Sequence, residues 1–305
     1  MKQISNQLAF SIAVCICACT MGAAESKVIA PGATLQKLAS EFSFTEGPAC
    51  DANGNVFFTD QPNDRIMKWS VDGKLSTYMQ PCGRANGMSF DPAGNLWACA
   101  DETNQLWRIA PDGKITVVVK DYQGKLLNGP NDVWVRPGGG LYITDPYYKR
   151  PWWHRGPKEM DECVYFLSAD GTKLTRVIDD YKQPNGIIGT PDGKTLYVAD
   201  IAAGKTYRYA IQSDGMLKDK KLFCELGSDG MTIDNEGNVY LTGNGFKGKG
   251  VSVFDSEGKP IEFIAIDEPW TANVCFGGKD RQTLFITASK SLYSLRMRVK
   301  GVDSQ

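Results

Sequence analysis

The sequence is built from six similar units, each with a short apolar run that follows a turn rich in Gly, Asp or Pro. Val, Ile, Phe, Tyr and Trp are frequent in these runs, which is typical of β-strands. The runs lie at residues 55–60, 95–100, 141–145, 196–200, 238–242 and 284–288. Because no segment carries a sustained apolar period of about 3.6 residues, the chain is predicted to be all-β with few helices.

A polar residue just before the first strand of each unit measures the length of the repeat. These residues are Glu46, Asn86, Asn131, Asn185, Asp229 and Asn273, at intervals of 40, 45, 54, 44 and 44 residues. Repeats of this length with three or four antiparallel strands are typical of propeller blades, so we predict a six-bladed β-propeller. The last unit has three strands of its own, and residues 34–40 are expected to supply its fourth strand and close the ring.

The first 24 residues have the pattern of a secretory signal peptide. Lys2 precedes an uncharged apolar run at 8–19, and residues 22–24 are small. The run is shorter than the roughly 20 residues that cross a membrane, and no other stretch is long enough. We therefore expect a secreted or periplasmic protein whose mature domain spans 25–305. A lipid anchor on Cys19 is the alternative, because residues 16–19 loosely resemble a lipobox.

Composition narrows the possible chemistry. The chain has 34 Lys and Arg against 35 Asp and Glu, so it lacks the excess of positive charge with which proteins neutralise nucleic-acid phosphates. Its single histidine, His154, excludes zinc, copper or iron sites that need several imidazoles. Six cysteines follow residue 24, widely spaced, and most are expected to be buried thiols. No feature indicates assembly, so a monomer is expected. Its expected partner is a small molecule.

The six polar residues point to a site on the propeller axis. The first strand of each blade lines the central channel, so residues at the same place in every blade form a ring. This ring would hold two carboxylates and four carboxamides, which are oxygen ligands suited to Ca²⁺. Mg²⁺, Mn²⁺ or Zn²⁺ could also occupy such a site. The competing interpretation is that the Asn-Gly and Asp-Gly pairs are only turns.

Four of these motifs resemble the signature positions of the gluconolactonase/regucalcin family. They lie at residues 45–48 (TEGP), 128–132 (NGPND), 184–187 (PNGI) and 228–231 (SDGM), and the resemblance extends over about residues 35–297. It implies a six-bladed propeller that hydrolyses a sugar lactone to the aldonic acid with the help of a divalent cation. It also implies that Glu46, Asn185 and Asp229 are the metal ligands, and that Asp229 is the general base.

The same resemblance implies a set of substrate contacts. Asn131 would lie beside the metal, Asn86 and Asn128 would bind ring hydroxyls, and Asp145 is a further candidate. The cation would polarise the lactone carbonyl while Asp229 accepts a proton from the attacking water. Regucalcin has an arginine two residues before the position of Asn131. Here that residue is Gly129, so the sugar preference does not transfer.

Two other functions remain open at this point. The same scaffold and metal could hydrolyse another ester or a phosphotriester, or the propeller could bind a glycan or a protein without catalysis. The insertion at 147–162, rich in Trp, Arg and Pro, also has two interpretations. It is either a lid that stacks on a sugar and binds an acidic group, or a packed surface loop.

Overall fold

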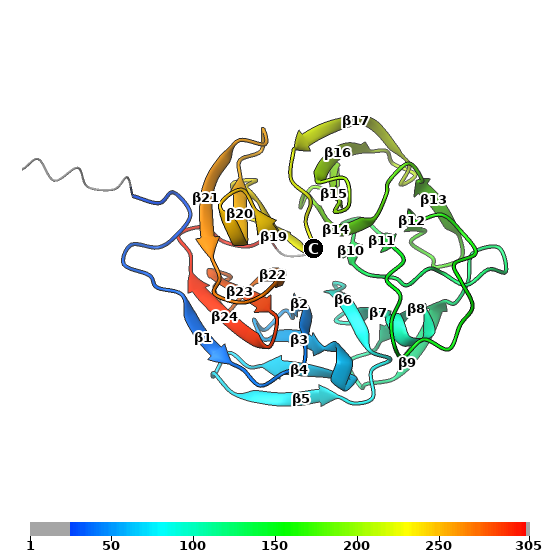
Figure 1. Ribbon diagram of the computed structural model, residues 1–305, viewed down its shortest axis with the longest axis horizontal. Coiled ribbons are helices and arrows are strands. Elements are labelled where there is room, and N and C mark those ends of the chain that lie inside the picture. Colours follow the sequence, from blue (N-terminus) through cyan, green and yellow to red (C-terminus); the bar gives the residue numbers. More distant parts are fainter. Residues whose placement is uncertain (1–24, 303–305) are drawn as a thin grey trace, which may run out of the picture.

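The computed structural model describes residues 25–302, in which six four-stranded antiparallel sheets surround a central axis (Figure 1). The prediction of a six-bladed β-propeller is therefore confirmed. Two short 3-10 turns, Gln61–Asn63 and Asp101–Thr103, are the helical elements of this part of the chain. None of its helices is long and apolar enough to cross a membrane. The predicted signal peptide and Cys19 lie outside the described residues.

Within each of the first five blades the strands follow one another from the channel outward. Blade 1 contains β2 (Thr45–Cys50), β3 (Val56–Asp60), β4 (Arg65–Trp69) and β5 (Leu75–Met79), and blade 2 contains β6 (Ala85–Phe90), β7 (Leu96–Ala100), β8 (Gln105–Ile109) and β9 (Ile115–Val119). Blade 3 contains β10 (Val133–Val135), β11 (Leu141–Asp145), β12 (Cys163–Leu167) and β13 (Leu174–Ile178), and blade 4 contains β14 (Pro184–Gly189), β15 (Thr195–Asp200), β16 (Lys205–Ile211) and β17 (Leu217–Cys224). Blade 5 contains β18 (Met231–Ile233), β19 (Val239–Gly245), β20 (Gly248–Phe254) and β21 (Pro260–Ala265).

Blade 6 joins the two ends of the propeller. It contains β22 (Thr271–Gly277), β23 (Thr283–Ala288) and β24 (Ser291–Arg296), and its outermost strand is β1 (Gln36–Ala39). β1 pairs antiparallel with β24, with Gln36 opposite Ser294 (Figure 1). Residues 34–40 thus supply the missing fourth strand, as predicted. The closure pairs the outer edge of β24, which would otherwise be open.

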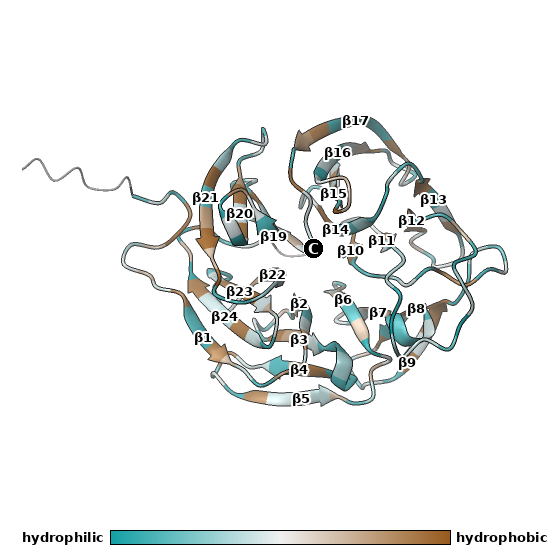
Figure 2. Cartoon of the chain, viewed as in Figure 1, coloured by the Kyte–Doolittle hydropathy of each residue, from teal (hydrophilic) through white to brown (hydrophobic). Residues whose placement is uncertain are grey.

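The hydrophobic core lies between neighbouring blades. One cluster joins Phe57 and Ile66 of blade 1 to Leu96 of blade 2, and the other clusters join adjacent blades in the same way. Because each sheet has a neighbour on both faces, its second strand is buried on both sides and reads as an almost continuous apolar run. Figure 2 shows hydrophobic residues along the strands of every blade.

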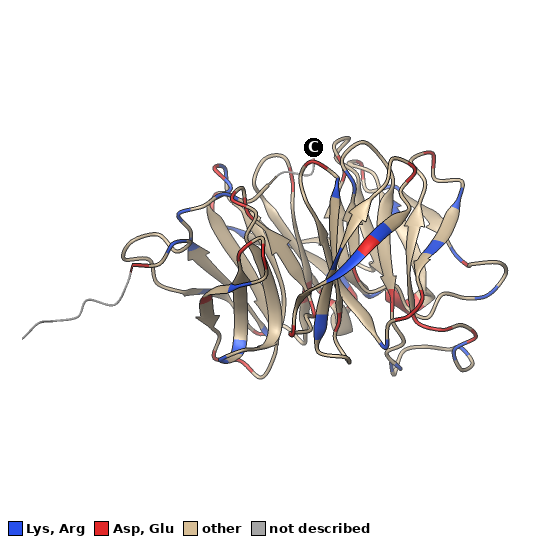
Figure 3. Ribbon diagram, turned by 90° about the horizontal axis from the view of Figure 1, so that it is seen from above, with Lys and Arg blue, Asp and Glu red and all other residues tan. Residues whose placement is uncertain are grey.

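Charged side chains gather in loops and on outer strands, with both signs interspersed (Figure 3). Among the cysteines of residues 25–302, Cys82, Cys99, Cys163, Cys224 and Cys275 are buried and not disulfide-bonded. Burial raises the pKa of the Cys82 and Cys163 thiols to about 12, so these thiols are neutral core residues, as the sequence predicts.

Candidate active site

Irregular pairing marks the point where each predicted polar residue joins its blade. In blades 1, 2, 4 and 6 the register between the first and second strands shifts beside Glu46, Asn86, Asn185 and Asn273. In blades 3 and 5 the paired strand starts later, and the Asn131 and Asp229 amides donate to Thr144 and Thr242 carbonyls at 2.9 and 3.3 Å. A shift of this kind re-aims the side chain at that position.

Three aspartates at the ends of second strands hold the segments that lead into the first strands. Each carboxylate accepts hydrogen bonds from two consecutive backbone amides, at distances between 2.8 and 3.2 Å. The pairs are Asp60 with Ser43 and Phe44, Asp145 with Asn128 and Gly129, and Asp200 with Lys182 and Gln183. We call these three residues the aspartate clamps. They fix the backbone next to Glu46, Asn131 and Asn185 before any ligand arrives.

The family resemblance predicts Asp145 and Asn128 as substrate contacts, but the structure gives both side chains another role. Asp145 is fully buried, and both of its oxygens accept backbone amides. Asn128 donates its side-chain amide to the carbonyls of Asp145 and Asp161. The structure places neither side chain in the wall of the axial cavity described next, because the Asp145 oxygens and the Asn128 side-chain nitrogen bond to the backbone behind it.

A cavity of about 400 Å³ opens at the end of the channel where these segments meet. We call it the axial cavity. It is lined by Phe44, Glu46, Asn86, Asn131, Tyr148, Arg150, Gln183, Ile201, Ala202, Asp229 and Trp270. Four of the six predicted ring residues thus lie in its wall, and a fifth, Asn185, bonds to two wall residues.

Asp229 is the best-held acid of the axial cavity. Its Oδ2 accepts a hydrogen bond of 2.5 Å from Trp270 Nε1, and its Oδ1 accepts one of 2.8 Å from Asn185 Nδ2. Asn185 Nδ2 also donates to the Tyr148 hydroxyl at 2.9 Å. Both amide hydrogens of Asn185 are then used, while its Oδ1 is buried and has no hydrogen-bond partner in the described chain.

Burial dominates the acidity of the two carboxyl groups. It raises the pKa of Glu46 well above its usual range, and the nearby Asp229 charge raises it further. Burial also raises the pKa of Asp229 to about 6, although the hydrogen bonds from Trp270 and Asn185 lower it in part. Neither acid forms an ion pair with a Lys or Arg side chain of residues 25–302. Arg150 in the same wall compensates the charge of the two acids only in part, so the site is suited to bind a cation.

The donor set fits a hard cation. Residues 25–302 contain no group of three or more Asp, Glu, His or Cys side chains placed to hold a metal. The oxygens available here are instead two carboxylates, Glu46 and Asp229, and the unpartnered carboxamide oxygen of Asn185. Oxygen ligands of this kind are typical of Ca²⁺, and three protein ligands would leave positions for water and substrate.

The insertion at 147–162, for which the sequence left open a lid or a packed surface loop, contributes two residues to the site. Tyr148 and Arg150 lie in the wall of the axial cavity, so part of the 147–162 insertion belongs to the site. Its aromatic and basic composition was the only sequence signal for this, and nothing indicated Trp270. His154 is exposed and lies outside the cavity wall.

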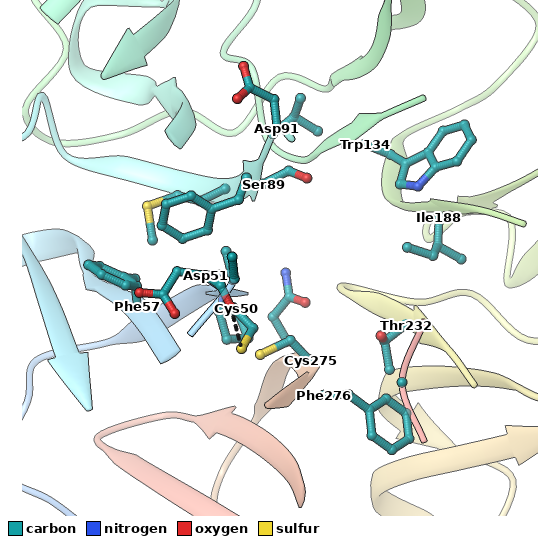
Figure 4. Close-up of a pocket in the computed structure, with 18 of the residues that line it drawn as sticks. Cys50, Asp51, Phe57, Ser89, Asp91, Trp134, Ile188, Thr232, Cys275 and Phe276 are labelled. Carbon is teal, nitrogen blue, oxygen red and sulfur yellow. Dashed lines mark hydrogen bonds between the residues drawn. The ribbon is translucent and has the colours of Figure 1, made fainter. Parts of the chain in front are cut away.

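A second cavity of about 790 Å³ lies at the opposite ends of the first strands. Figure 4 shows Cys50, Trp134, Cys275 and Phe276 around it. Asn273 and Asp132 line this cavity rather than the axial one, so the predicted ring of six is wrong for Asn273. The Asn273 side chain turns away because its Oδ1 accepts the backbone amide of Val274 at 2.8 Å.

Comparison with known proteins agrees with this geometry. Residues 44–290 match the sequence model of the SMP-30/gluconolactonase/LRE-like region. The chain belongs to this family. The match runs from the segment before β2 to the turn after β23, so it includes every residue of the axial cavity. The family resemblance identified from the four motifs is therefore confirmed.

Individual relatives show the same family. A gluconolactonase of Zymomonas mobilis is 30% identical over 306 aligned positions, which cover 88% of this chain and 82% of that protein. The crystal structure of a gluconolactonase from Xanthomonas campestris has a TM-score of 0.81 at 29% identity, covering 88% of this chain and 91% of that one. Regucalcin from Agrobacterium tumefaciens, described as a calcium-binding protein, shares the fold with a TM-score of 0.74 at 19% identity and coverage of 89% and 96%.

Proposed function

We propose that this family member is a lactonase that hydrolyses a sugar lactone to the aldonic acid with a bound divalent cation, Ca²⁺ being the best fit. The observation that carries the proposal is the pair of acids, buried Glu46 and half-buried Asp229, which share one wall of the axial cavity with carboxamides. The 30% identity to a gluconolactonase over most of both chains supports the reaction class.

The cation would be held by Glu46, Asn185 and Asp229. When bound, it would supply Lewis-acid polarisation of the lactone carbonyl. Mg²⁺, Mn²⁺ and Zn²⁺ also accept oxygen ligands, so availability decides between them as much as geometry does.

The chain's own residues supply the proton transfer and the orientation. Asp229 accepts the proton of the attacking water, because its carboxylate lies in the cavity wall beside the proposed cation position. Trp270 and Asn185 hold its carboxylate in one orientation through the hydrogen bonds described above. Asn86 and Asn131 lie in the same wall and present amides to the hydroxyls of the sugar ring.

The test is lactone hydrolysis by purified mature protein, residues 25–305, with glucono-1,5-lactone and a panel of related lactones. Each reaction is run with Ca²⁺, Mn²⁺, Zn²⁺ or EDTA, and Asp229→Asn serves as the inactive variant. Turnover that EDTA abolishes and Asp229→Asn lacks supports the proposal. Metal binding without lactone turnover would indicate another ester or a phosphotriester as substrate. Absence of metal binding would indicate a non-catalytic glycan- or protein-binding propeller.

We also propose that residues 1–24 are a signal peptide and that the mature protein is a secreted or periplasmic monomer. Mass spectrometry of the exported protein tests this directly, because a free N-terminus near residue 25 supports cleavage. A lipid on Cys19 would instead indicate membrane anchoring. Size-exclusion chromatography with light scattering measures the oligomeric state.

A further inference from the structure

We propose that Arg150 makes the axial cavity selective for lactones that carry an additional acidic group, a carboxylate or a phosphate, over neutral lactones. This inference rests on the proposed lactonase function and names the substrate class of that same cavity. Its basis is the position, the support and the unsatisfied hydrogen-bonding capacity of one guanidinium group.

The first step is the position of Arg150. It is the one Lys, Arg or His among the residues that line the axial cavity, and it shares the wall with Glu46 and Asp229. Without a cation, its charge partly compensates these two acids. A divalent cation held by the acids would neutralise both of them, and the guanidinium would then be the remaining charge in the wall. An anionic group on the substrate is its natural partner.

The second step is how rigidly the guanidinium is held. It lies over the rings of Tyr148 and Trp152, with its central carbon 5.2 and 5.6 Å from their centroids. Arg150 Nε is 3.7 Å from Asp101 Oδ2, which is too long for a hydrogen bond. The same Asp101 oxygen accepts a 2.8 Å hydrogen bond from Trp152 Nε1. Stacking and charge therefore orient the guanidinium without using its donors.

The third step is the attachment of the insertion to the propeller. Trp153 Nε1 donates to the Asp101 carbonyl at 2.8 Å. Its ring packs on Gly129, where a Cβ atom would come within 2.7 Å of the indole. Gly129 adopts a φ of +153°, and one of the aspartate clamps holds its amide. The loop that carries Arg150 is thus seated on the clamped segment that leads to Asn131.

The fourth step is the unmet donor. Arg150 Nε is buried and has no hydrogen-bond partner among residues 25–302. A buried guanidinium donor that lacks a partner is unfavourable. Nε faces the buried Asp101, whereas the Arg150 side chain as a whole is 24% exposed and donates no hydrogen bond within residues 25–302. A carboxylate or phosphate of the substrate would accept from the two terminal nitrogens of the guanidinium, whose planar fork matches the geometry of both groups. A neutral hydroxyl would satisfy it less well, because hydrogen bonds between charged groups are stronger.

The experiment compares three lactones with the wild type and three variants. The lactones are a glucarolactone with a carboxylate, 6-phosphogluconolactone with a phosphate, and neutral glucono-1,5-lactone. Arg150→Gln removes the charge and Arg150→Lys keeps it. Lys149→Gln is the matched control, because it removes the same charge from the exposed neighbouring residue. A thermal melt of each variant reports whether the fold is kept.

We expect the wild type to have a kcat/KM at least tenfold higher for one of the acidic lactones than for the neutral one. Arg150→Gln should lower this ratio by about 10- to 100-fold, as expected for a charged hydrogen bond. Arg150→Lys should restore part of the ratio, and Lys149→Gln should keep it. The acidic lactone with the higher kcat/KM shows whether Arg150 prefers a carboxylate or a phosphate. A ratio that Arg150→Gln leaves unchanged overturns the proposal.

A binding measurement separates this proposal from the reaction itself. Calorimetry compares D-glucarate with D-gluconate, which differ by one carboxylate, in the wild type and in Arg150→Gln. If no lactone is hydrolysed but glucarate binds at least tenfold more tightly through Arg150, the proposed reaction fails and the selectivity stands. If lactones are hydrolysed and both acids bind equally in the two proteins, the reaction stands and the selectivity fails.

Discussion

The first strands present acids and amides at one end of the channel, and mostly apolar side chains and thiols at the other. At the far end, turn aspartates such as Asp51, Asp91 and Asp234 direct their oxygens to neighbouring amides. At the axial cavity, backbone amides are bound instead by the aspartate clamps, which lie at the ends of the second strands. Glu46 Oε2 still accepts the Gly47 amide at 3.0 Å, and the Asp229 oxygens accept hydrogen bonds from the Trp270 and Asn185 side chains. A carboxylate has about four lone-pair sites, so both groups can also bind a ligand.

Asp132 sharpens this comparison, because it is a buried acid at the far end. Its Oδ1 accepts the Val133 amide at 3.0 Å, and burial raises its pKa to about 8. It is therefore largely protonated at neutral pH. Acids line both cavities, so the two ends differ instead in that an acid of the axial cavity, Asp229, is bonded to a carboxamide, Asn185, whose buried oxygen has no partner among residues 25–302.

The largest expected effect is the loss of activity in Asp229→Asn. Removing the proton acceptor should lower kcat/KM for a hydrolysed lactone by about 10²- to 10⁴-fold. Asp132→Asn is the matched control at the far end and should stay within a few-fold of wild type. Steady-state kinetics with both variants measure the difference, and an equal loss in the two would contradict the assignment of the axial cavity.

Removal of the cation should have the second-largest effect, a decrease in thermal stability. A cation at 100 times its Kd stabilises the native state by about 2.7 kcal/mol, so EDTA should lower the melting temperature by several degrees. Glu46→Gln should remove most of this response because it deletes one ligand charge, while Asp132→Asn should retain it. A Ca²⁺-dependent shift of equal size in Glu46→Gln would place the cation elsewhere.

The aspartate clamps predict a smaller effect on turnover. Asp145→Asn weakens the support of the segment before Asn131 and should lower kcat about tenfold. Asp91→Asn is the control, since Asp91 holds a turn at the far end through Asn95 and Trp97. It should lower the melting temperature with little change in kcat. Equal kcat values for the two variants would mean that the clamps serve stability alone.

The smallest effect on turnover, and a clear effect on stability, is expected from the pH dependence of Asp132→Asn. The native state keeps the Asp132 proton up to about pH 8, whereas the unfolded chain releases it near pH 4. The free energy of unfolding contributed by this group therefore falls as pH rises between these values.

The Asp132→Asn side chain does not ionise, so this pH-dependent fall in the free energy of unfolding is absent from the variant. The melting temperature of the variant minus that of the wild type should increase from pH 4.5 to 8.5. Differential scanning calorimetry at constant ionic strength measures it. A difference that stays flat with pH would show that Asp132 ionises with an ordinary pKa in the folded protein.

Blade number, ring closure and the location of the polar residues followed from the sequence alone. Each blade is a run of short hairpins between neighbours in the chain, so its pattern is local and repeats every 40 to 54 residues. The same locality made Glu46, Asn185 and Asp229 recognisable, because each stands where a first strand begins.

Only the tertiary structure decided which side chains meet. Asn131 and Asp132 are adjacent in sequence but line different cavities, and the Asp132 carboxylate accepts the Val133 amide on the side of the far one. Asn273 turns from the ring, and Asp145 is consumed by backbone amides. Tyr148, Arg150 and Trp270 reach the site from segments outside the first strands. Such contacts form only when the ring closes and packs loops from different blades together, so no local pattern in the sequence encodes them.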